Sequence, residues 1–122
     1  MKIADANIVL RYLLNDTEEL EEKATEILEK NEVFLPNEVI AEVVYVLEKV
    51  YEVKNDEISD TLKELFEYDN IELSDLALLE AALDLYGNKQ LDFVDTLLYA
   101  YNKVKGYRIY TFDKKLKKLL ED

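Results

Sequence analysis

The sequence predicts an α/β fold in which helices connect and cover the strands of a parallel sheet. Short apolar runs alternate with longer segments whose apolar residues recur at helical spacing, and this alternation is typical of strands joined by crossover helices. Only two glycines and one proline occur in 122 residues, which leaves no room for a flexible linker or a glycine-rich phosphate loop. We therefore expect a single domain over residues 1–122.

Four short apolar runs are the expected strands. Residues 2–4 form the first, and residues 33–35 form the second, which Pro36 ends. Residues 71–73 are a possible strand, and residues 108–112 alternate with β-branched and aromatic side chains, which favours a strand.

The remaining segments predict helices. Asp16 and Glu19 form a capping-box pattern at the start of one of them, and Gly106 is a natural stop for another. The expected helices cover residues 7–14, 16–30, 37–53, 56–67, 75–86, 93–104 and 114–120.

Composition excludes several kinds of chemistry. The chain has neither cysteine nor histidine, so disulfides, thiolate catalysis, Cys-based zinc sites and imidazole bases are ruled out. No apolar run approaches the roughly 20 residues that a membrane helix needs, and the first residues do not resemble a signal peptide. We expect a cytoplasmic protein without a membrane segment, whose acid–base or metal chemistry relies on carboxylates, Lys, Tyr or water.

Charge is distributed unevenly along the chain. The net charge is −13, which repels a polyanion at long range. Residues 103–122 nevertheless carry seven basic and only three acidic side chains. This basic segment could hold a phosphate backbone locally, or it could simply be a solvated face.

Several acidic residues stand at strand ends or helix starts. Asp5 follows the first expected strand, Asp113 follows the last, and Asp92 and Asp95 stand three apart at a helix start. Each of them could be an ordinary helix cap. However, the carboxyl ends of parallel strands meet at one edge of a sheet, so these side chains could also converge.

A fifth acid stands out on a helical wheel. Glu42 lies at the border of the apolar arc of residues 39–50, whereas Glu48 and Glu52 lie on the opposite face. A carboxylate drawn partly into a core needs a cation or hydrogen bonds, and an ion pair with Lys49 is the structural alternative. If Glu42 and the other acids converge, their repulsion favours a bound divalent cation, and oxygen-only ligands suit Mg²⁺ or Mn²⁺. Such metals hydrolyse phosphodiesters without a side-chain nucleophile.

Four segments contain these acids: residues 3–13, 36–47, 91–98 and 111–115. In order and spacing they resemble the PIN-domain proteins, and in particular the VapC-type toxins of toxin–antitoxin pairs. The resemblance implies a three-layer α/β/α fold with a parallel sheet of four or five strands. It also implies Mg²⁺- or Mn²⁺-dependent endoribonuclease activity on single-stranded RNA, a homodimer, and an antitoxin whose basic segment covers the site.

The resemblance also assigns roles to individual residues. The four family acids correspond to Asp5, Glu42, Asp95 and Asp113 as catalytic metal ligands, with Asp92 as a frequent fifth ligand. Asn7 and Thr111 correspond to polar residues that support the acids. The side chains expected to line the RNA approach are Lys103, Lys105, Arg108, Lys114 and Lys115.

One position departs from the family pattern, because Ala6 stands where Thr or Ser is usual. The lost hydroxyl could loosen the support of the acids. Three other interpretations stay open at this point: a PIN nuclease of RNA processing without a toxin role, a catalytically silent PIN-like binding module, and an acidic α/β protein whose carboxylates are only caps.

Overall fold

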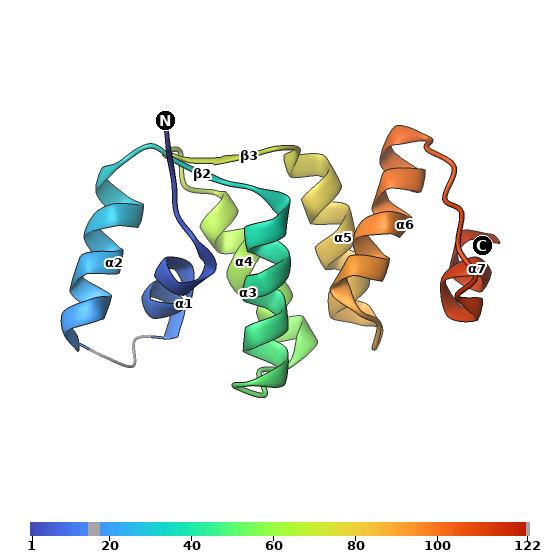
Figure 1. Cartoon of the computed structure of the whole chain (residues 1–122), viewed down its shortest axis with the longest axis horizontal. Coiled ribbons are helices and arrows are strands. Elements are labelled where there is room, and N and C mark those ends of the chain that lie inside the picture. Colours follow the sequence, from blue (N-terminus) through green and yellow to red (C-terminus); the bar gives the residue numbers. More distant parts are fainter. Residues whose placement is uncertain (15–17, 122) are drawn as a thin grey trace.

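The chain forms three strands and seven helices in the part that the structure, a computed structural model, describes (Figure 1): residues 1–14 and 18–121, with Glu18 described by its backbone alone. The α/β class predicted from the sequence is confirmed. The predicted capping residue Asp16 lies outside the described residues. The elements are β1 Lys2–Ile3, α1 Ala6–Leu14, α2 Glu18–Lys30, β2 Val33–Leu35, α3 Asn37–Lys49, α4 Asn55–Phe66, β3 Ile71–Leu73, α5 Leu76–Asn88, α6 Phe93–Lys105 and α7 Lys114–Glu121.

The sheet is parallel and has the order β1-β2-β3. Val33 and Leu35 of the central strand are fully buried, as is most of Ile71 in β3. The helices gather on one side of the strands (Figure 1). Glu72, which alternates with the buried positions, is exposed. The sheet therefore carries the core on one face, as alternation along a strand requires.

The expected sheet of four or five strands is realised only in part. Residues 106–113 have neither helical nor strand structure, so the predicted strand over residues 108–112 is not formed. The alternating β-branched and aromatic residues of this segment are present, but a strand also needs a neighbouring backbone to pair with. Because this segment does not reach the sheet, β1 remains an edge strand.

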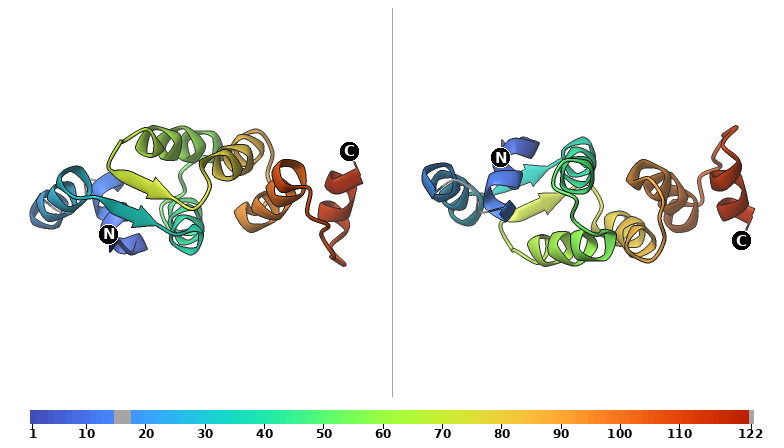
Figure 2. Two further views of the ribbon diagram at one scale, coloured as in Figure 1. Left: turned by 90° about the horizontal axis from the view of Figure 1, so that it is seen from above. Right: turned by 90° about the horizontal axis from the view of Figure 1, so that it is seen from below.

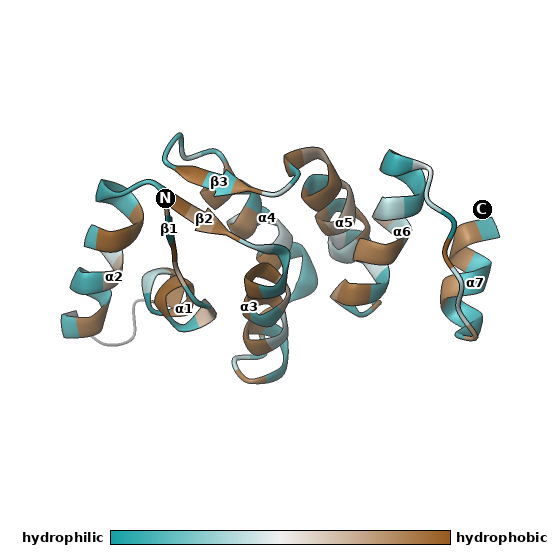
Figure 3. Cartoon of the chain, turned by 45° about the horizontal axis from the view of Figure 1, so that its top comes forward, coloured by the Kyte–Doolittle hydropathy of each residue, from teal (hydrophilic) through white to brown (hydrophobic). Residues whose placement is uncertain are grey.

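The helices are spread along the long axis of the molecule. Figure 2 shows α2 at one end and α7 at the other, with α5 and α6 between the sheet and α7. Apolar residues are continuous along β2 and over much of α5 (Figure 3), which packs against both α4 and α6. Of the helices described, none has the length and apolar character that crossing a membrane requires.

Two helix ends show why the predicted boundaries hold or shift. Gly106 follows α6 with φ 72°, the left-handed conformation that the sequence predicted for a helix stop. By contrast α3 ends at Lys49 rather than near Val53, because Glu52 adopts φ 54° and turns the chain. A positive φ at a residue other than glycine is uncommon and does not continue a helix.

The packing of α4 on α5 depends on a small residue at Gly87. A Cβ atom at this position would lie 3.0 Å from Cβ of Ser59, whose hydroxyl donates a hydrogen bond of 2.8 Å to the carbonyl of Leu83. Ser59 is buried, so it has little room to move. Gly87 therefore sets how closely the two helices approach.

We expect Gly87→Ala to lower the free energy of unfolding by about 1 kcal/mol. Alanine gains about 1 kcal/mol of helix propensity, but crowding a packed interface costs about 1–3 kcal/mol. Urea denaturation followed by circular dichroism measures the difference. A variant more stable than the wild type would show that the helices separate without cost and would contradict this account.

Candidate functional site

A cleft of about 610 Å³ opens between the C-terminal half of α3, the start of α6 and the start of α7. It brings together three of the five predicted acids, namely Asp92, Asp95 and Asp113, and two of the predicted RNA-contacting lysines, Lys114 and Lys115. The other lining residues are Glu48, Lys49, Asn55, Gln90 and Leu91. Residues more than 60 positions apart in sequence thus form one polar hollow.

Two of these acids are placed by the first turn of α6. Asp92 occupies the N-cap position, but its side chain makes no capping hydrogen bond, and Asp95 lies one turn further along. Residues three apart share one face of a helix. The sequence also allowed Asp92 to be an ordinary helix cap. Its backbone does occupy the N-cap position, but its carboxylate makes no hydrogen bond to the start of α6.

Asp113 is placed by the start of α7. Its Oδ1 accepts a hydrogen bond of 2.8 Å from the backbone N–H of Leu116, so it does cap the helix. The Thr111 hydroxyl accepts a bond of 3.0 Å from the backbone N–H of Asp113. Thr111 thus fixes the backbone that carries Asp113.

Asp95 carries the electrostatic cost of this grouping. Its carboxyl is half-buried, and burial raises its pKa above the ordinary value; the negative charges of Asp113 and Asp92 raise it further. Removal from water and nearby like charges both disfavour ionisation. A cation in the cleft would relieve both effects, so this arrangement fits a cation-binding site in its chemistry.

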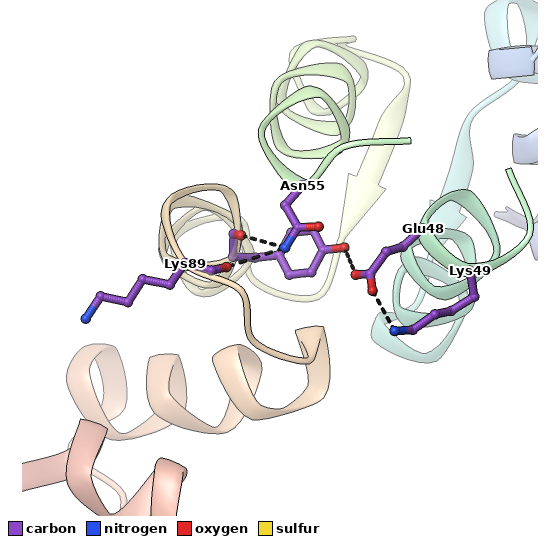
Figure 4. A network of polar contacts seen from close by, with 5 residues as sticks. Glu48, Lys49, Asn55 and Lys89 are labelled. Carbon is purple, nitrogen blue, oxygen red and sulfur yellow. Dashed lines mark hydrogen bonds and ion pairs between the residues drawn. The ribbon is translucent and has the colours of Figure 1, made fainter. Parts of the chain in front are cut away.

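Glu48 is a cleft residue that sequence reasoning missed. The buried hydroxyl of Tyr86 donates a hydrogen bond to one carboxylate oxygen of Glu48, and Nζ of Lys49 lies 2.8 Å from the other (Figure 4). The amide of Asn55 donates to the carbonyls of Tyr86 and Lys89, both at 3.4 Å. Burial favours the neutral acid, but the bonds from Lys49 and Tyr86 outweigh it and hold the pKa of Glu48 below its ordinary value.

The prediction that Glu42 is drawn towards the core is wrong. Glu42 is exposed, whereas Glu48, placed by the helical wheel on the polar face, is the half-buried acid. The reason is that the end of α3 faces the Tyr86 hydroxyl of α5, which gives a carboxylate a buried partner. Lys49, proposed as an ion-pair partner of Glu42, binds Glu48 instead.

The structure does not gather all five predicted acids. Asp5 and Glu42 are not among the residues that line the cleft, and Asp5 caps α1 by accepting a bond of 3.1 Å from the backbone N–H of Ile8. Over residues 1–14 and 18–121, no three acidic side chains lie close enough together to hold a metal ion. The cleft is thus a partial assembly of the predicted site.

The remaining predicted residues lie in varied surroundings. Lys105 forms an ion pair of 2.5 Å with Asp75, and Nζ of Lys103 lies 5.5 Å from the centre of the Tyr99 ring. Arg108 is exposed. Asn7 is also exposed and lines a separate hollow between α1 and α2. Of the basic residues predicted to line the RNA approach, Lys114 and Lys115 are the ones that share the cleft with the acids.

Comparison with known proteins identifies the fold that carries this cleft. The family model described as PIN domain matches residues 2–121. The chain belongs to the PIN-domain family. It is also similar to a protein named VapC ribonuclease from Aquifex aeolicus (strain VF5), with 31% identity over 98% of this chain and 92% of that protein. No solved structure gives a significant match.

Membership of the PIN-domain family confirms the resemblance drawn from the four sequence segments. The match spans every element from β1 to α7. The hydrogen bond from Tyr86 to Glu48 could not be found from spacing alone, since it joins α5 to α3 across 38 residues.

The network around Glu48 predicts a pH-dependent contribution to stability. A depressed pKa stabilises the fold above the pKa of the unfolded state, and this contribution is lost as the pH falls through the folded value. We expect Glu48→Gln to lower the free energy of unfolding by about 1 kcal/mol at pH 7, the net contribution of a typical hydrogen bond. The difference from the wild type should shrink towards pH 3.

Denaturation at pH 7 and pH 3 measures this effect, with Glu64→Gln, an exposed position on α4, as the matched control. A loss for Glu48→Gln that is equal at both pH values would show that the charge of Glu48 contributes nothing.

Proposed function

We propose that this protein is a metal-dependent endoribonuclease that cleaves single-stranded RNA, and that it is the toxin of a VapC-type toxin–antitoxin pair. The observation that carries the proposal is the cleft in which Asp92, Asp95 and Asp113 lie beside Lys114 and Lys115. Its support is the similarity of the whole chain to a VapC ribonuclease. Metal-dependent hydrolysis of a nucleic acid needs carboxylates that bind the metal ion, next to basic side chains that bind the phosphate backbone.

The proposed cofactor is Mg²⁺ or Mn²⁺, which bind oxygen ligands. The residues that would hold it are Asp5, Glu42, Asp92, Asp95 and Asp113, of which three share the cleft. When bound, such an ion activates water and stabilises the charge that develops on the phosphate. The contribution of this chain is a partly buried carboxylate, Asp95, whose pKa is raised by burial and then by the charges of Asp113 and Asp92, and a cation at this site would neutralise those charges.

The proposed substrate is positioned by the basic residues next to the acids. Lys114 and Lys115 begin α7 and line the cleft, so they would contact backbone phosphates of RNA bound there. Arg108 and Lys103 extend the basic surface along the preceding segment. A net charge of −13 makes such local contacts necessary, because the body of the protein repels RNA at long range.

The same charge suits the proposed protein partner. An antitoxin with a basic segment would be attracted to the acidic body, and an Arg or Lys placed among the carboxylates would replace the cation. We also propose that the protein is a homodimer and acts in the cytoplasm, where its RNA substrate is found.

Cleavage of mixed single-stranded RNA in the presence of Mn²⁺ tests this function. We expect cleavage by the wild type to be lost in EDTA and reduced at least about 100-fold in Asp95→Asn, because a ligand and its charge are removed. The fold should be retained, since ionised Asp95 is disfavoured in the folded protein.

Asp69→Asn, an exposed position before β3, is the matched control and should cleave like the wild type. Cleavage by Asp95→Asn at the wild-type rate would remove Asp95 from the site, and cleavage that persists in EDTA would refute the metal mechanism.

A further inference from the structure

We propose that two copies of this chain exchange their C-terminal arms, so that residues 107–113 of one copy pair with the β1 edge of the other and complete its site with Asp113. The arm is defined here as residues 107–121. This inference rests on the proposed function for the role of Asp113, but the exchange itself is tested separately below.

The first observation is an unpaired strand edge. β1 pairs only with β2 among the described strands, and its other edge carries no partner. Ile3 on this strand is 65% exposed. An open edge with an apolar side chain is a template for pairing with another chain.

The second observation is a segment that is suited to strand pairing but pairs with none of the described strands. Residues 107–113 have neither helical nor strand structure, and the alternating Tyr110 and Phe112 are 91% and 98% exposed. Exposed aromatic side chains in a row of β-forming residues favour burial on a sheet. The sequence independently predicted a strand here. The segment therefore lacks a neighbouring strand, and the open edge of β1 can provide one.

The arm is held away from the β1 of its own chain. Tyr107 stacks on Tyr101 of α6 with ring centres 6.1 Å apart, and the Asn102 amide donates a bond of 2.9 Å to the Tyr107 carbonyl. Leu116 and Leu119 of α7 are buried, and α7 packs on α6. Figures 1 and 2 place the arm at the opposite end of the long axis from β1. A second copy can pair with the arm where it lies.

Charge complementarity supports this occupant. Residues 103–122 carry seven basic and three acidic side chains, whereas the rest of the chain carries eight basic and 25 acidic ones. The arm of one copy is therefore attracted to the body of another. Two such contacts related by a two-fold axis satisfy both edges and close the assembly as a dimer.

The exchange would also explain why Asp5 lies outside the cleft that contains Asp113 in a single chain. Asp5 lies two residues after the end of β1, and Asp113 directly follows Phe112. If residues 108–112 pair in parallel with β1, both acids lie at the same edge of the sheet. Each site then takes Asp5 from one copy and Asp113 from the other.

Cross-linking tests the pairing without reference to activity. The chain contains no cysteine, so Ile3→Cys and Thr111→Cys introduce the only thiols. We expect a short bis-maleimide to give a covalent dimer when the two single variants are refolded together, but not with either variant alone. A chain that carries both cysteines serves as the control for pairing within one chain. If the mixture of single variants gives no covalent dimer, the exchange is overturned, whether or not the double variant links within itself.

Complementation tests the shared site. Asp5→Asn and Asp113→Asn should each be inactive alone, but refolded together they should recover about a quarter of wild-type cleavage. Random pairing makes half of the dimers mixed, and each mixed dimer holds one complete site of two. Inactive mixtures beside an active wild type would overturn the shared site. An inactive wild type would instead count against the proposed nuclease, while the cross-link still decides the exchange.

Discussion

The fully buried Tyr86 is the contact on which the arrangement of the helices around the cleft depends. Its hydroxyl donates to Glu48 of α3, its carbonyl accepts from Asn55 of α4, and its ring meets Phe93 of α6 edge-on at 5.8 Å. One residue of α5 thus contacts three other helices, two through its side chain and one through its backbone carbonyl. Removing a buried hydroxyl would leave Glu48 with only Lys49, and removing the ring would open a cavity beneath the start of α6. Since Asp92 and Asp95 begin that helix, the geometry of the cleft follows from a tyrosine that does not line it.

The acids of the cleft differ in how their charge is satisfied, and this difference separates structural from functional roles. Glu48 is balanced by two donors, which lower its pKa, so its charge stabilises the fold. Asp95 has burial and two negative neighbours, which raise its pKa, so its charge costs stability. A carboxylate of this kind in a cleft is a candidate for a functional role, and a divalent cation would balance its charge through the oxygen ligands available. The same reasoning supports the proposed role of the basic residues, because a polyanion would be attracted to this acidic protein only where lysines gather.

Much of the fold could be predicted from the sequence, because it depends on local patterns. The strands over residues 33–35 and 71–73 and the helix stop at Gly106 are all present, since short apolar runs and a left-handed glycine act locally. The strand over residues 108–112 is not formed, because pairing is a long-range property that residue preferences do not contain. The site was predicted less completely. Asp92, Asp95 and Asp113 share a cleft. The helical wheel, however, predicted Glu42 to be partly buried and Glu48 to be exposed, whereas the reverse is true. A wheel cannot show that Tyr86 lies opposite the end of α3. Family resemblance supplied the ligand set that spacing alone left open.

The central claim is that the carboxylates around Asp95 form a divalent-cation site rather than a group of helix caps. The most direct measurement is calorimetric titration of Mn²⁺ into the wild type and into Asp95→Asn at pH 7. The account predicts saturable binding by the wild type and an affinity at least about tenfold weaker in the variant, as expected when a ligand is lost. Equal affinities, or no binding by a folded wild-type protein, would contradict it and would leave these acids as caps and solvated charges.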